Sequence, residues 1–168
     1  TPSEFAREGE TAIETLTRLA QSLSTVNGTL DLLGLELYES SLAGGDMASK
    51  LVDLFGGLEA FTSVTSGYYQ NFYSEEERLR KAGETVNEAL KSIGVELDVF
   101  GGEAAKVQYR ELVEKAFAEG NNELAAQLLQ MSAAFSDVAN AAEQATRALN
   151  DSLVAILKRF SDGASESR

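Results

Sequence analysis

The chain has 168 residues and a net charge of −13, with no histidine, cysteine or tryptophan. This excludes disulfides, the usual zinc, haem and iron–sulfur ligand sets and histidine-dependent catalysis, so we expect no cofactor and no metal. Its only proline is Pro2 and helix formers dominate, which predicts an all-α fold; no basic stripe suits nucleic acid, and no apolar run spans a bilayer.

The first predicted region, residues 1–43, carries an apolar repeat with steps of four and three residues. Such steps average about 3.5 residues and are typical of a coiled-coil seam. Asn27-Gly28 and Gly34 weaken the helix and predict a flexible point or a break near 27–34. We expect this seam to make contacts through its leucines: Leu16, Leu19, Leu23, Leu30, Leu33 and Leu37.

The second predicted region, residues 44–102, opens with Gly44-Gly45-Asp46. This triplet predicts the first clear interruption, with Asp46 as the N-cap of the following helix. Gly56-Gly57 lies inside a helical pattern and predicts a kink or a close approach of two helices. Ser74, followed by three glutamates, predicts another helix start, because Ser and Glu three residues apart form a capping box.

Five aromatic residues fall within thirteen positions of this region: Phe61, Tyr68, Tyr69, Phe72 and Tyr73. Spacing alone is typical of ordinary core residues, and it puts Phe61, Tyr68 and Phe72 on one helix face. Tyr69 and Tyr73 lie one residue further round. We therefore expect the first three to line the seam and these two tyrosines to contact a second partner.

Residues 98–102 predict a turn, and the third region, 103–160, begins with a helix to about Glu119. Gly120-Asn121-Asn122 predicts a helix end followed by an N-cap. A second seam follows, with Leu128, Met131, Phe135, Val138 and Leu149 as its expected contacts and further apolar residues as far as Phe160. The small, polar residues 161–168 predict a disordered tail.

No motif for catalysis stands out. The acids Glu75-Glu76-Glu77 fit a helix N-terminus better than a metal or acid–base site, because no calcium-loop spacing accompanies them. No glycine pair has the spacing of a phosphate-binding loop. The segment LVAILKRF, residues 153–160, has some membrane-surface character but fits the end of a seam better.

The segment LVDLFGGLEAFTSVTSGYYQNFYSEEERL, residues 51–79, resembles a recurring stretch in the later part of phage and prophage tail tape-measure proteins. SIGVEL at 92–97 and YRELVE at 109–114 are also similar to that family, so the likeness covers residues 25–140. Two departures affect loops only. Asp98 stands where the family often has proline, and residues 115–122 replace a Thr-rich turn.

The resemblance implies a non-catalytic structural role. Tape-measure proteins are helical rods, often three copies together, whose length sets tail length. Their later part meets tail-tube and tail-tip proteins, and they leave the tube before DNA ejection. It implies a homo-oligomer, expected to be a trimer, in the tail lumen of the virion and in the bacterial cytoplasm during assembly.

Two alternatives remain open. The favoured fold has extended helices with heptad seams joined by short Gly/Asn turns. The same seams could instead close within one chain as a compact antiparallel helical bundle, which would suit a small secreted or scaffold-binding interaction protein. A carboxylate-based hydrolase is a third reading, supported only by the abundance of acids.

Overall fold

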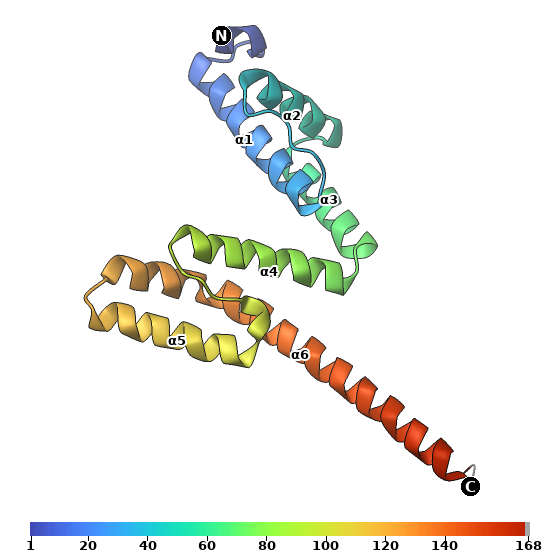
Figure 1. Cartoon of the computed structure of the whole chain (residues 1–168). Helices are drawn as coiled ribbons and strands as arrows, with labels where there is room; N and C mark the ends of the chain where they lie inside the picture. The colour runs from blue at the N-terminus through green and yellow to red at the C-terminus, as the bar shows by residue number, and fades with distance from the viewer. Residues whose placement is uncertain (167–168) are drawn as a thin grey trace. The chain divides into compact units, whose positions relative to one another are not determined.

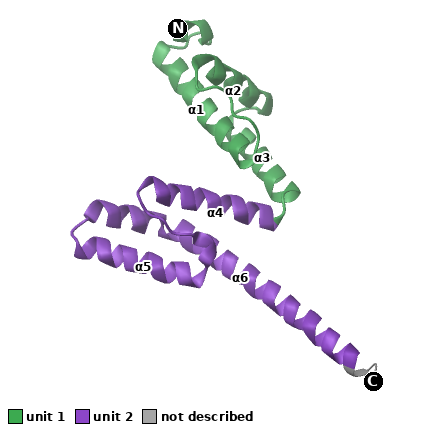
Figure 2. Cartoon of the chain, in the orientation of Figure 1, with its two compact units in different colours: residues 1–74 green, residues 75–168 purple. Residues whose placement is uncertain are grey.

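The computed structural model describes residues 1–166 and contains helices but no strand in that part of the chain, which confirms the all-α prediction. The chain divides into two compact units, residues 1–74 and 75–168 (Figure 2). The division falls where Ser74 predicted a helix start. Each unit has its own apolar core.

Unit 1 holds a short 3-10 helix, η1 (Pro2–Phe5), and three α-helices: α1 (Ala12–Leu32), α2 (Leu42–Phe55) and α3 (Leu58–Phe72). The helix α1 begins with a capping box, in which the Thr11 hydroxyl accepts the Glu14 amide and the Glu14 carboxylate accepts the Thr11 amide. Helices α1 and α2 lie side by side (Figure 1). The core of unit 1 is formed by Val26 of α1, Ala48 and Val52 of α2, and Phe61 of α3.

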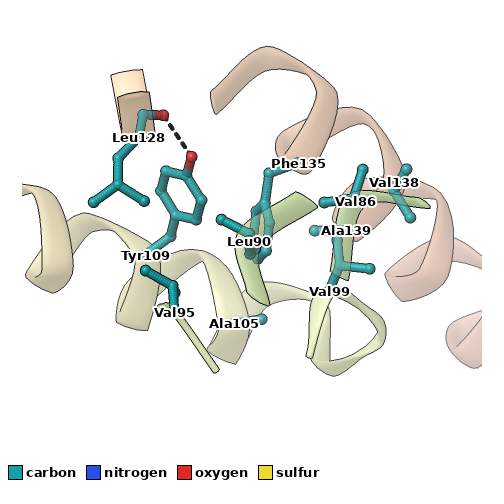
Figure 3. Packing of buried hydrophobic residues seen from close by; sticks show 10 residues of the cluster. All are labelled: Val86, Leu90, Val95, Val99, Ala105, Tyr109, Leu128, Phe135, Val138 and Ala139. Carbon is teal, nitrogen blue, oxygen red and sulfur yellow. Dashed lines mark hydrogen bonds between the residues drawn. The ribbon is translucent and has the colours of Figure 1, made fainter. Parts of the chain in front are cut away.

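Unit 2 holds α4 (Glu75–Ser92), the 3-10 turn η2 (Val99–Gly101), α5 (Glu103–Ala118) and α6 (Asn122–Glu166). Helices α5 and α6 form a hairpin, and α4 and η2 pack against α6. Figure 3 shows the core between them, where Tyr109 and Phe135 meet with ring centroids 4.4 Å apart. The Tyr109 hydroxyl donates to the carbonyl of Leu128, which satisfies a polar group inside the core.

Several predicted boundaries agree with the structure. A helix ends near the predicted break at 27–34, with Gly34 at φ +72°. A turn occupies 98–102, and α5 spans the predicted range. Gly120 at φ +75° ends that helix, and the Asn121 side chain accepts the Leu124 amide at 3.2 Å at the start of α6.

The glycine pair predicted as an interruption lies inside a helix, and the pair predicted as a kink or a close approach separates two helices. Gly44-Gly45 lies inside α2, not at a break, and Ser41 caps this helix in place of Asp46. A Cβ on Gly45 would stand 2.9 Å from the Cβ of Leu19, so glycine is needed where α2 crosses α1 closely. Gly56-Gly57 forms the break itself, with φ of +93° and +132° between α2 and α3.

The remaining differences concern helix ends. The predicted seam helix of the first region is shorter than its repeat, because the chain leaves the helix after Leu32. Asn27 then bonds the returning loop twice, through the amide and the carbonyl of Tyr38. At the other end, the tail predicted at 161–168 is helical as far as Glu166, and residues 167–168 lie outside the described part.

Candidate interaction surfaces

The aromatic block lies on α3, and its buried face is not the predicted one. Phe61 is buried in the core of unit 1, edge-on to Phe55 with ring centroids 5.1 Å apart. Tyr69 is also buried, and the Tyr73 hydroxyl donates to the Leu33 carbonyl at 3.0 Å. The structure therefore places Tyr69 inside unit 1 and ties Tyr73 to the loop after α1, whereas the sequence predicted that both would contact a second partner.

Tyr68 and Phe72 form the outward part of the same helix. Their rings stack with centroids 5.0 Å apart, and the side chains are 48% and 75% exposed. The buried residues of α3 are Phe61 and Tyr69, and Tyr73, which follows the helix, is half-buried; the prediction placed Tyr68 and Phe72 on the buried face instead. One residue of drift along α3 was enough to exchange the two faces, because neighbouring positions are about 100° apart.

The first seam is divided between core and surface. Leu19 is buried, and Leu23 and Leu30 pack at the edge of the unit 1 core. Leu16 is exposed at the start of the helix. Leu33 and Leu37 lie beyond the end of α1, where Leu37 is half exposed, so the seam does not continue as a helix through them.

The second seam is also divided, along the single helix α6. Its first half forms the core of unit 2 through Leu128, Phe135 and Val138, with Met131 packed at the core edge. Its second half is open. Leu149 is 61% exposed, and every described side chain from Gln144 to Ala164 lies at the surface. Beyond the first turn of α4, Figure 1 shows α6 with no other helix of unit 2 beside it.

The surface hollows of unit 2 include two that border α6. One, of about 760 Å³, lies where the first turn of α4 meets α6 and is lined by Glu75, Leu79, Ala145 and Leu149 among others. The other, of about 280 Å³, lies between α5 and α6, with Lys106 and Arg110 beside Leu129 and Phe135. Glu76, Arg78 and Gln144 add polar side chains to the first hollow, but both hollows are open to solvent and neither is an enclosed ligand site.

A dense polar network lies in unit 1 and was not predicted from the sequence. Arg18 donates to both carboxylate oxygens of Glu10 at 2.9 Å, to the Ser49 hydroxyl at 2.6 Å and to the Phe5 carbonyl at 2.8 Å. Hydrogen bonding from Arg18, with further bonds from the Arg7 amide and the Thr15 hydroxyl, lowers the pKa of Glu10 to about 2. The pair ties the N-terminal segment to α1 and α2.

This network has the character of a structural clamp. Each polar group of Arg18 and Glu10 has its partner within the protein, so neither is poised to transfer a proton. Among residues 1–166 no three acidic side chains converge as a metal site would require, and no helix there is long and apolar enough to cross a bilayer.

Comparisons with protein-family models, curated protein sequences and solved structures find no match for this chain. Only the residues of the chain and their geometry therefore bear on its function.

Proposed function

We propose that the chain is a structural segment of a phage or prophage tail tape-measure protein and has no catalytic role. The observation that carries this proposal is the segment 51–79, which resembles that family. In the structure the Gly-Gly of this segment is the break before α3, four of its aromatic residues lie on α3, and its three glutamates begin α4.

The role proposed for the whole protein follows from the resemblance. Copies of the chain, expected to be three, lie together in the tail lumen, meet the tube and tip proteins, and leave before DNA does. Assembly takes place in the bacterial cytoplasm. A net charge of −13 supports this role, because an acidic surface repels the phosphates of DNA that must pass along the same tube.

The location of the chain tests the proposal. Purified virions, probed with an antibody to this chain, should contain it, and particles triggered to eject their DNA should have lost it. A major capsid protein measured in the same samples is the control for recovery. Absence from intact virions, with the parent gene expressed, would contradict the tape-measure role.

A second candidate is a helical interaction module of a secreted or scaffold-binding protein. The division into two units, each with its own core, favours it, because such cores close apolar seams within one chain. The virion experiment separates the two candidates: this second role expects the chain outside virions, in the culture medium or on a cellular partner.

A further inference from the structure

The second half of α6 presents a continuous apolar stripe. Leu149 and Phe160 are 61% and 79% exposed, and Leu153 and Ile156 between them are about half exposed. Steps of four, three and four residues place all of them on one side of the helix. We call the set Ala145, Leu149, Leu153, Ile156 and Phe160 the α6 stripe.

This stripe continues an interface that already exists. Leu128, Phe135, Val138 and Ala142 lie on the same seam of the same helix, and they bury themselves against other helices of unit 2. The helix carries the seam past the first turn of α4 without a cap or a glycine break before Gly163. Ala145 and Leu149 lie beside the first turn of α4, and from Leu153 onward the stripe has the spacing of a helix-packing face but no helix of unit 2 to pack against.

The segment that carries the stripe is close to neutral, whereas the rest of the chain is acidic. Residues 143–166 hold four acids and three bases, while the whole chain has a net charge of −13. Arg147, Asp151, Lys158 and Asp162 fall on the side opposite the stripe at about 100° per residue, so no charged group interrupts its centre. Two copies of the segment can approach each other with little of the repulsion that the acidic remainder would cause.

We propose that the α6 stripe packs against the same stripe of further copies of this chain. In heptad terms Leu153 and Phe160 take a positions and Leu149 and Ile156 take d positions. Every a and d position from 149 to 160 is therefore apolar, as a helix-packing seam between copies requires. A parallel, in-register arrangement rests on the proposed function, since copies in one tail tube share a direction; the interface itself does not.

Sedimentation equilibrium of the full chain tests the interface. The wild type should be a concentration-dependent oligomer, and the double variant L153E/I156E should weaken association on the order of a hundredfold or more, because both glutamates place charges where apolar side chains pack. V154E is the matched control. Val154 is 63% exposed but lies outside the stripe, so this variant should associate like the wild type.

A wild type that stays monomeric throughout, or an oligomer that L153E/I156E leaves unchanged, would overturn the interface. Far-ultraviolet circular dichroism of both variants checks that unit 2 stays folded. Neither result would bear on whether the chain resides in virions, so failure of this inference and failure of the proposed function are distinguishable.

A cysteine variant then tests the direction of pairing, and the chain has no cysteine of its own to interfere. In a parallel, in-register bundle L149C brings identical positions together and should form an intermolecular disulfide on mild oxidation. In an antiparallel pair Leu149 lies opposite Phe160, so only a mixture of L149C with F160C should cross-link. The second outcome would overturn the parallel arrangement.

Discussion

Glycines show most clearly how a single residue acts in this fold. Two Gly-Gly pairs have different roles: Gly56-Gly57 breaks the chain between two helices with positive φ angles, and Gly44-Gly45 lies inside a helix where other parts of the chain approach closely. Sequence cannot separate these uses, because both need the missing Cβ: one for a positive φ, the other for space. The distinction depends on what packs beside the helix, and here the neighbour is Leu19 of α1.

Gly45→Ala should therefore destabilise unit 1 by about 1–3 kcal/mol, because the new methyl group would press on the Leu19 backbone. Gly28→Ala is the matched control. Gly28 lies within α1 with nothing within 4 Å of an added Cβ, so this change should stabilise the unit by about 0.5–1 kcal/mol. Urea unfolding followed by circular dichroism measures both, and equal effects of the two changes would refute the close-approach argument.

The carboxylate of Glu10 predicts a pH dependence for unit 1. Its pKa falls from 4.5 to about 2 on folding, because Arg18 and other donors hold the charged form. The unfolded chain therefore takes up this proton first, and the stabilisation present above pH 4.5 is lost as the pH falls towards 2.

Glu10→Gln should remove this contribution, so that wild type and variant differ most near neutral pH and converge at about pH 2. Chemical unfolding of both proteins at intervals between pH 7 and 2 gives the difference. A gap that stays constant over this range would show that the Glu10–Arg18 pair does not titrate as described.

At the scale of elements, helix starts and stops could be predicted well where capping chemistry is local. Asn121 and Gly120 are examples, because the cap and its partners lie within a few residues. The buried face of α3 could not be predicted from the sequence. Whether Tyr68 or Tyr69 points inward depends on the neighbouring helices, and the two candidate faces differ by one residue in an equally apolar pattern.

The helix α6 gives the sharpest prediction at this scale. Leu128 and Leu149 occupy equivalent seam positions, yet Leu128 is fully buried and Leu149 is open. Leu128→Ala should cost unit 2 about 2–5 kcal/mol, through lost burial and the cavity left behind. Leu149→Ala should change the unfolding of dilute, dissociated chain by less than about 0.5 kcal/mol. Similar losses at both sites would mean that the second half of α6 is packed within the unit.

For the whole molecule, the fold class could be predicted from composition, whereas the packing of the helices is known only from the structure. The missing histidine and cysteine, the single proline and the excess of helix formers led directly to an all-α chain. Heptad spacing does not reveal which part of a seam is buried within the chain. Unit 1 buries much of its seam in its own core, and unit 2 buries only the first half of the seam on α6.

Tail length gives a direct test of the proposal that this chain is a structural segment of a tape-measure protein. Inserting three further tandem copies of residues 143–163 into the parent gene adds whole heptads and about 95 Å of helix. Electron microscopy of the resulting particles should show tails longer by about that distance, while an insertion of equal length in an unrelated tail gene leaves them unchanged. Tails of unaltered length, on particles that contain the elongated protein, would contradict the account.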